Sequence, residues 1–515
     1  MAGHSAAAAG PGPAAAESAA ETAVADPRRW LILAVIAAAQ LMVVLDLTVM
    51  NLALPSAQRA LGFTTTDRQW VVTAYALSFG SLLLFFGRLA DLIGRKVTFL
   101  TGLVGFAAAS AVGGASGTFA MLVTARACQG VFAALLAPSA LSLLATTFKD
   151  PKERGKAFGV YGAVAAAGGG LGLLLGGVLT TYLSWRWCMF INLVFAVFAL
   201  IGGVLLVGRQ QRTPGSRLDV PGVLSVSGGM LCLVYGFSNA ASHSWRTPST
   251  WGFLAAAGAL LVAFAVWQSR AASPLLPPRV VLDRNRAGAY LTVLISGAAT
   301  FGVFLFLIYY MQETLRYSAV KSGAALLPLV VLSGTMAVLG NTKLIPRIGP
   351  KPMVIAGMLL NAGGMLWLTR IGAQSGYAST LLGPLMVTGA GMGLIFGMVA
   401  ATGTFGVAPH DAGVASASIN TGQQLGGSIG TALLNTIAAS AVTGYLAGHL
   451  HGRPTPQLLQ LAAIHSYTTV FWWCAGIFAA GAVICGALLR GGPLTRPEGT
   501  PAPVPSPQAT AAVKG

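Results

Sequence analysis

The stretch LMVVLDLTVMNLALPSA, from Leu41 to Ala57, is almost entirely apolar, yet Asp46 lies near its middle. The hydrocarbon core of a bilayer is about 30 Å thick, so a helix needs roughly 20 apolar residues to cross it. The apolar run that contains Asp46 extends over residues 30–54, which is long enough. We therefore expect a membrane-spanning helix that carries one carboxyl group in its interior.

The rest of the chain has the same apolar character. Of the 515 residues, 55% are hydrophobic and only 9% are charged, whereas soluble domains contain about 25% charged residues. So few charges cannot cover a water-facing surface. The net charge of +18 comes from Lys and Arg in short clusters between apolar runs, not from a basic domain. We predict an all-α polytopic membrane protein without a nucleic-acid partner.

Fourteen apolar runs are long enough to be transmembrane helices. They lie at residues 30–54, 69–87, 97–116, 119–147, 156–182, 187–208, 220–239, 250–268, 287–311, 322–342, 352–371, 378–402, 412–442 and 464–489. If the chain crosses the membrane at each run, successive loops alternate between its two sides and both chain ends lie on the same side. Most of the 31 Lys and Arg residues lie on that side. Because cytoplasmic loops are enriched in Lys and Arg, we expect both termini in the cytoplasm.

Two patterns recur eight runs apart, which indicates an internal repeat. LADLIGRK (Leu89–Lys96) follows the second run, and LIPRIGPK (Leu344–Lys351) follows the tenth. Glycines spaced by four residues occur in the fifth run (Gly168, Gly172 and Gly176) and in the thirteenth (Gly422, Gly426 and Gly430). Such a stripe lets another helix approach closely. Any glycine-rich membrane helix can produce this spacing, but its matching places favour a repeat.

The repeat predicts two pseudo-symmetric six-helix bundles and two inserted helices, an architecture typical of transporters with a site near the midplane. The predicted parts are a disordered cytoplasmic tail at 1–29, an N-terminal bundle at 30–208, the inserted helices at 220–268, a C-terminal bundle at 287–489 and a second disordered cytoplasmic tail at 490–515.

Several motifs resemble those of a known family. GRLADLIGRK (Gly87–Lys96) and RACQG (Arg126–Gly130) resemble the loop and fourth-helix motifs of the major facilitator superfamily. Three further stretches resemble its fourteen-span drug/proton antiporter branch, the EmrB/QacA type. They are LDLTVMNLALP (Leu45–Pro55), TDRQWVVTAYAL (Thr66–Leu77) and AGVASASINTGQQLGGSIGTA (Ala412–Ala432). The resemblance implies proton-driven export of lipophilic drugs or antibiotics across a bacterial plasma membrane. That branch usually has a Gly-Pro pair in its fifth helix, but Leu173 stands here where Pro is expected.

Asp46 and Arg126 are the charged residues that lie well inside predicted spans. Insertion scales put the cost of a charged Asp at a helix centre at roughly 2.5–3.5 kcal/mol, so Asp46 needs a partner or must change its protonation. Arg126 lies at a similar predicted depth and is the natural partner. The pair could be a permanent structural ion pair. Alternatively, Asp46 carries a proton, with burial favouring its neutral form and Arg126 its charged form. The family resemblance favours the carrier.

Other residues are candidates for substrate binding or gating. Aromatic rings and amides suit flat apolar ligands, and the cavity candidates are Asn51, Trp70, Tyr75, Gln129, Tyr309, Tyr310, Gln423 and Gln424. A packing or interfacial role remains open for each. The gating candidates are Gly87, Asp91, Gly94, Arg95, Gly168, Gly172 and Gly176. The resemblance implies that Asp91 docks on a helix N-terminus near Ala412, where Asp411 would compete.

We therefore expect a proton-coupled efflux antiporter whose partners are a small lipophilic drug or antibiotic, protons and the lipid bilayer. The alternatives are a symporter or facilitator on the same fold and, from another class, a membrane sensor or structural protein. No phosphate-binding GxxxxGK[ST] loop occurs, so ATP is not an expected energy source. The five cysteines are isolated, and His449 and His451 share one polar loop, so no catalytic site, metal or cofactor is expected.

Overall fold

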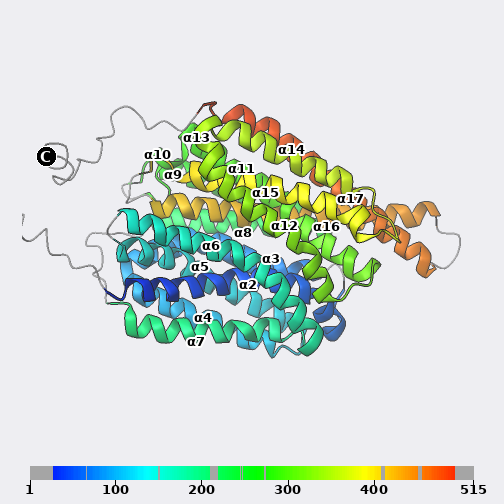
Figure 1. Ribbon diagram of the computed structural model, residues 1–515, viewed down its shortest axis with the longest axis horizontal. Helices are drawn as coiled ribbons and strands as arrows, with labels where there is room; N and C mark the ends of the chain where they lie inside the picture. Colours follow the sequence, from blue (N-terminus) through cyan, green and yellow to red (C-terminus); the bar gives the residue numbers. More distant parts are fainter. Residues whose placement is uncertain are drawn as a thin grey trace, which may run out of the picture.

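The computed structural model describes residues 27–64, 67–148, 151–208, 219–243, 245, 247–271, 274–407, 412–449 and 455–492. The two tails predicted to be disordered lie almost wholly outside these ranges. Within the described residues the regular structure is entirely helical. The long helices lie side by side in one layered assembly (Figure 1).

The helices fall into two groups along the chain, joined by an inserted pair. The N-terminal helix group consists of α2 (Arg29–Leu61), α3 (Arg68–Ile93), α4 (Arg95–Gly114), α5 (Phe119–Thr147), α6 (Pro151–Val178) with the π-helix η1 (Leu179–Leu183), and α7 (Trp187–Leu206). The inserted pair is α8 (Val220–His243) and α9 (Pro248–Gln268). The C-terminal helix group consists of α10 (Pro278–Val281), α11 (Arg284–Tyr309) with η2 (Tyr310–Thr314), α12 (Ala319–Leu339) with η3 (Gly340–Leu344), α13 (Ile345–Ile348), α14 (Pro350–Leu368), η4 (Tyr377–Leu381), α15 (Leu382–Thr404), α16 (Ala412–His449) and α17 (Pro456–Leu488).

Length and composition mark most of these helices as membrane spans. Among the described residues, 12 helices are long and apolar enough to cross a membrane. The described part of α3 contains the shorter apolar stretch Trp70–Leu83, and the end of α6 together with η1 contains Gly168–Leu183. The long helices occupy the positions predicted from the apolar runs, but the predicted count of fourteen spans is not confirmed.

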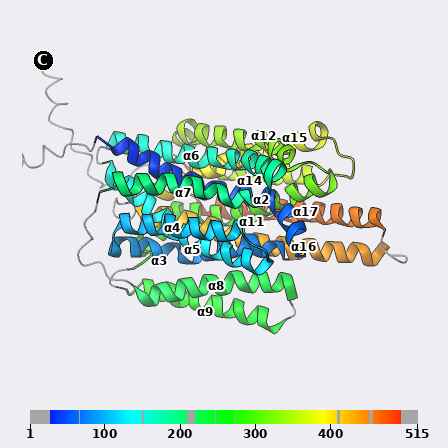
Figure 2. The same cartoon turned by 90° about the horizontal axis from the view of Figure 1, so that it is seen from below.

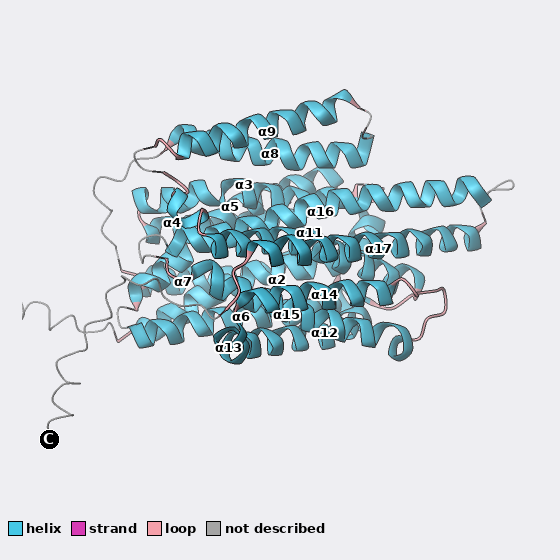
Figure 3. Ribbon diagram, turned by 90° about the horizontal axis from the view of Figure 1, so that it is seen from above, coloured by secondary structure: helices cyan, strands magenta, loops and turns pink. Residues whose placement is uncertain are grey.

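The last two helices are longer than the sequence indicated. The apolar runs predicted helices at 412–442 and 464–489, whereas α16 continues to His449 and α17 begins at Pro456. Thr455 caps α17 by accepting a hydrogen bond from the Leu458 amide, and Pro456 suits the first turn. We call the end where α2 begins and α17 ends the terminal end, and the opposite end the distal end. At the distal end α16 and α17 project beyond the other helices (Figures 1 and 3).

The two helix groups pack by the same pattern. In the N-terminal group α2 packs on α6 and α7, while α5 packs on α3 and α4. In the C-terminal group α11 packs on α16 and α17, while α15 packs on α12 and α14. The groups meet where α3 packs on α16 and α6 packs on α12. The inserted pair lies at the edge of the assembly, with α8 against α3 and α16 (Figure 2).

Both glycine stripes lie where another helix comes too close for a side chain. A Cβ atom on Gly176 of α6 would lie 2.9 Å from the Cα of Val49 in α2. A Cβ atom on Gly430 of α16 would lie 1.9 Å from the carbonyl oxygen of Ala298 in α11. The close approach predicted for each stripe is therefore confirmed, and it occurs at corresponding helix pairs in the two groups.

The repeated loop motifs also share a backbone conformation. Gly94, between α3 and α4, has a φ of 104°, and Gly349, between α13 and α14, has a φ of 78°. Residues with a Cβ atom rarely adopt positive φ, which explains why glycine occupies both positions. The two motifs thus form equivalent turns at the terminal end, one in each helix group.

Candidate functional site

Asp46 lies near the middle of α2 and is buried, with 1% of its surface exposed. Its Oδ2 atom accepts a hydrogen bond from Arg126 Nη1 of α5 at 2.5 Å. Its Oδ1 atom accepts from Gln129 Nε2 at 3.0 Å and from Asn192 Nδ2 at 2.8 Å. Both carboxylate oxygens therefore have donors, as a buried negative charge requires. The predicted contact between Asp46 and Arg126 is confirmed.

Arg126 is also 1% exposed and is held from several sides. Its Nη1 donates to Gln129 Oε1 at 2.8 Å, and its Nε donates to the Val71 carbonyl oxygen at 3.2 Å. The guanidinium lies 4.5 Å from the centre of the Tyr75 ring, so the ring's negative face stabilises the cation. Tyr75 and Gln129, both predicted cavity residues, thus belong to the surroundings of the ion pair.

Two members of this network were missed in the sequence. Asn192 of α7 and Ser110 of α4 are both fully buried. Ser110 Oγ accepts from Gln129 Nε2 at 2.7 Å and from Asn192 Nδ2 at 3.3 Å. The available signal was a single polar residue inside an apolar helix, as in CMFINLVFAV around Asn192. The network, which we call the Asp46 network, joins α2, α4, α5 and α7.

In this arrangement a proton on Asp46 would change the charge balance of the buried ion pair. In the described geometry the carboxylate and the guanidinium neutralise each other. Removing one charge from a buried pair is strongly unfavourable because the other charge is left unpaired. A proton on Asp46 would therefore require Arg126 to find water or another anion. The free-energy cost of a proton on Asp46 therefore depends on which other groups can reach Arg126.

The predicted aromatic cavity residues lie in different places. Trp70 of α3 packs against Tyr235 of the inserted helix α8, with 6.0 Å between ring centres. Tyr309 lies under the guanidinium of Arg68, 4.4 Å from it. Tyr310 donates its hydroxyl hydrogen to the Gly372 carbonyl oxygen at 2.7 Å. None of these contacts brings the three rings to the Asp46 network, and their role in binding a substrate stays a prediction.

The amide candidates lie nearer to the contact between the two helix groups. Gln424 of α16 is buried, and its Cβ atom would lie 3.4 Å from a Cβ on Gly80 of α3. Asn51 of α2 and Gln423 of α16 are half-buried. Gln424 therefore occupies the α3–α16 contact, where a change in the relative position of the groups would alter its surroundings. Substrate contact by these three residues stays a prediction.

The gating candidates are partly described. Gly94 makes the turn expected of it, and Arg95 begins α4. A Cβ on Gly87 would lie 3.6 Å from the Cβ of Pro138, which is an ordinary contact. The side chain of Asp91 and the whole of Asp411 lie outside the described residues, and so does His451. The predicted docking of Asp91 therefore stays a prediction.

At the distal end the two helix groups are bridged by polar contacts. Arg68 of α3 forms an ion pair with Glu313 of η2. Glu313 also accepts a hydrogen bond from the Tyr467 hydroxyl at 3.4 Å. Gln312 Nε2 donates to the carbonyl oxygen of Leu52 in α2 at 3.4 Å. These contacts hold the distal ends of α2 and α3 to η2.

Comparison with known proteins places these observations in context. The profile of the Major Facilitator Superfamily matches residues 36–431. The puromycin resistance protein pur8 of Streptomyces alboniger is 46% identical over 466 residues, which is 90% of this chain and 92% of that protein. The cephamycin export protein CmcT of Amycolatopsis lactamdurans is 38% identical over 409 residues, 79% of this chain and 84% of that protein.

A solved structure shares the fold. A bacterial homolog of the human lysosomal transporter Spinster, in an inward-facing and unoccupied conformation, aligns with a TM-score of 0.63. The alignment covers 90% of this chain and 98% of that chain at 14% sequence identity, so the likeness concerns the fold alone.

Proposed function

The chain belongs to the major facilitator superfamily, and from that premise we propose that it is a proton-coupled antiporter that exports lipophilic drugs or antibiotics. The names of its relatives support drug export, since pur8 is a resistance protein and CmcT an export protein. The same relationships favour a transporter over an enzyme, a sensor or a structural protein.

The Asp46 network is the observation that carries proton coupling. It contains a buried carboxylate whose charge is balanced by one buried arginine. In the proposed cycle, a hydrated cavity facing outward lets Asp46 take up a proton as the drug leaves. When the cavity faces inward, Asp46 releases the proton and pairs with Arg126 again. One charge crossing 100 mV supplies about 2.3 kcal/mol, equivalent to roughly a fifty-fold drug gradient per proton.

We further propose the fourteen-span architecture of the EmrB/QacA type, with two six-helix bundles that rock about the Asp46 network. The repeated packing pattern and the equivalent turns at Gly94 and Gly349 support the two bundles. In this arrangement α3 and α6 also cross the membrane. The terminal end faces the cytoplasm of a bacterial cell, in accordance with the distribution of Lys and Arg. The single carboxylate in the network favours neutral or singly charged substrates.

Purified protein in liposomes with an imposed pH gradient tests this function. Puromycin is a suitable probe because of the relationship to pur8. An antiporter takes puromycin up against its gradient when the lumen is acidic, because protons then flow outward. A symporter does so only with an acidic exterior, and a facilitator equilibrates puromycin under either gradient. Uphill uptake that requires an acidic exterior, or no uphill uptake of puromycin or of the other exported antibiotics tried, would contradict the proposal.

A further inference from the structure

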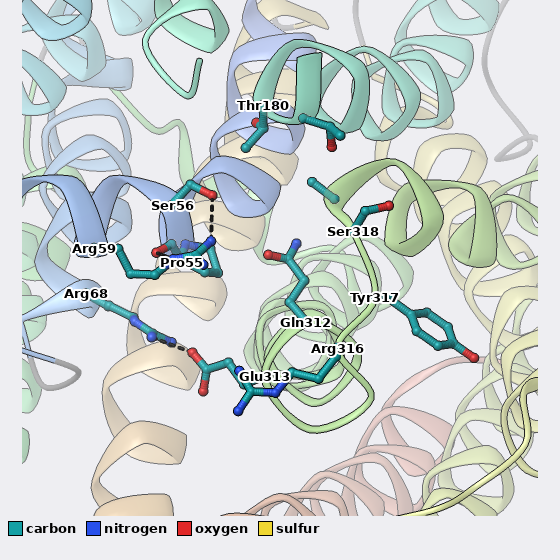
Figure 4. A pocket seen from close by; sticks show the side chains of 12 residues that line it. Pro55, Ser56, Arg59, Arg68, Thr180, Gln312, Glu313, Arg316, Tyr317 and Ser318 are labelled. Atoms are coloured by element: carbon teal, nitrogen blue, oxygen red, sulfur yellow. Dashed lines mark hydrogen bonds and ion pairs between the residues drawn. The ribbon is translucent and has the colours of Figure 1, made fainter. Parts of the chain in front are cut away.

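A pocket of about 450 Å³ lies at the distal end, between the two helix groups (Figure 4). Arg59 of α2 and Arg68 of α3 line it from the N-terminal group. Glu313 of η2 and Arg316, in the segment before α12, line it from the C-terminal group. We call this the distal pocket. It lies apart from the Asp46 network, and the proton-coupled cycle proposed above does not use it.

The distal pocket carries an excess of positive charge. Its lining contains three guanidinium groups and one carboxylate. The carboxylate, that of Glu313, pairs with Arg68. Among the described residues, no carboxylate lies within ion-pair distance of Arg59 or Arg316. A cleft with charges of one sign and low-dielectric walls concentrates ions of the opposite sign.

The charged groups are held in place by their neighbours. Arg68 is 7% exposed, lies over the Tyr309 ring and donates to Gln58, but its buried Nη1 has no hydrogen-bond partner among the described residues. Arg59 donates from Nη2 to Ser56 Oγ at 3.1 Å. The guanidinium groups of Arg68 and Arg59, both in the pocket lining, are therefore fixed in position by their neighbours.

We propose that the distal pocket binds an oxyanion, the carboxylate or phosphate group of a small or amphiphilic molecule, between Arg59 and Arg316. Planar guanidinium groups match the two oxygens of a carboxylate or phosphate. The hydroxyls of Ser56 and Thr180 also line the pocket and supply further donors. Pro55 and Ala319 also line the pocket and give it apolar surface, against which the body of the molecule packs.

A bound oxyanion bridges the two helix groups, because Arg59 belongs to one and Arg316 to the other. It adds to the Arg68–Glu313 contact and so stabilises the conformation whose distal end is closed. The oxyanion comes either from solution or from the headgroup of an anionic phospholipid. Oxyanion binding at this site requires neither a drug nor a proton gradient. The proposal can therefore be tested independently of the proposed antiport.

Thermal unfolding of the full chain in nanodiscs of phosphatidylcholine tests the site. Inorganic phosphate and citrate are titrated, with sodium chloride used to keep the ionic strength constant. We expect a saturable rise in Tm. Combining Arg59→Gln with Arg316→Gln raises the apparent Kd at least tenfold, whereas Arg370→Gln leaves it unchanged. Arg370 is a matched control because it is exposed and follows α14 at the same end, outside the pocket.

A second arm replaces part of the phosphatidylcholine with phosphatidylglycerol. If a headgroup fills the pocket, Tm rises without added phosphate, the rise requires Arg59 and Arg316, and phosphate adds nothing further. If the ligand is soluble, phosphatidylglycerol leaves the phosphate titration unchanged. The absence of a saturable shift in both arms overturns the proposal. So does a shift that survives in the double variant, or one that Arg370→Gln abolishes equally. We expect Asp46→Asn to retain the phosphate-induced rise in Tm, because this site does not depend on proton coupling.

Discussion

Asn192 of α7 donates a hydrogen bond to Asp46 of α2 at 2.8 Å, in a site where both residues are buried. The carboxylate is therefore held by an amide from a third helix as well as by the guanidinium of α5. A change in the charge of Asp46 weakens this contact together with the ion pair. In the proposed cycle, this contact gives α7 a direct part in the rearrangement that follows proton binding.

Asn192→Ala removes this donor, and we expect it to destabilise the protein by about 1.5–3 kcal/mol, the range for a hydrogen bond to a charged group. Thermal unfolding in detergent measures the effect, and puromycin uptake should fall with it. Asn341→Ala is the matched control, since Asn341 is exposed in η3. Equal stability of the two variants would show that Asn192 does not support the carboxylate.

The glycine stripe of α16 can be tested within one helix. Gly430→Ala places a Cβ atom against the Ala298 carbonyl oxygen, so we expect a loss of at least about 1–3 kcal/mol in the free energy of unfolding. Gly444→Ala, farther along α16, meets no atom within 4 Å and should raise helix stability by roughly 0.5–1 kcal/mol. Thermal unfolding measures the stability of both variants. Similar changes in stability for Gly430→Ala and Gly444→Ala would contradict the close α11–α16 contact.

Leu173→Pro introduces the residue that the resemblance led us to expect at this position, yet we expect it to be harmful here. α6 is continuous through Leu173, and a Cβ atom on Gly323 of α12 would lie 2.3 Å from the Leu173 carbonyl oxygen. Proline removes a helix hydrogen bond and costs about 3 kcal/mol or more. Leu173→Ala separates this backbone effect from loss of the side chain. Unchanged stability and faster uptake in Leu173→Pro would refute the expectation.

The ion pair between Arg68 and Glu313 should favour a closed distal end. Because the Glu313 side chain is 38% exposed, we assign the pair no more than about 1 kcal/mol, which is a several-fold change in population. Glu313→Gln should therefore raise, several-fold, the rate at which a polar maleimide labels Ser56→Cys in the pocket. The exposed Cys128 is first replaced by Ser. Asp67→Asn is the control at the same end, and an equal increase in that variant would show that the Arg68–Glu313 ion pair does not hold the distal end closed.

The sequence was sufficient for the placement of the helices and for the central ion pair. Apolar runs identify the spans because the bilayer sets their length, and two isolated charges inside spans must pair to avoid the cost of burial. The same rule did not reveal Asn192 or Ser110. An uncharged polar side chain costs less to bury, and the direction it faces depends on how the helices pack.

The sequence also misjudged features that are not set by the hydrocarbon core. The apolar run predicted a helix that ends at residue 442, but α16 continues to His449 because polar residues can extend a helix into water. The sequence also did not indicate that Trp70 packs on Tyr235 of an inserted helix. Its predicted role in the drug cavity stays a prediction. Hydropathy indicates that an aromatic residue lies in a span, but not which neighbouring helix it contacts.

Proton release on substrate binding tests the central role of Asp46 most directly. Puromycin is added to the purified protein in weakly buffered detergent solution, and the released protons are followed with a pH-sensitive dye. We predict release from the wild type and from Asp283→Asn, an exposed helix-cap residue for which Asn is an equivalent cap. We predict none from Asp46→Asn that still binds puromycin. Undiminished release from that Asp46 variant would contradict the account.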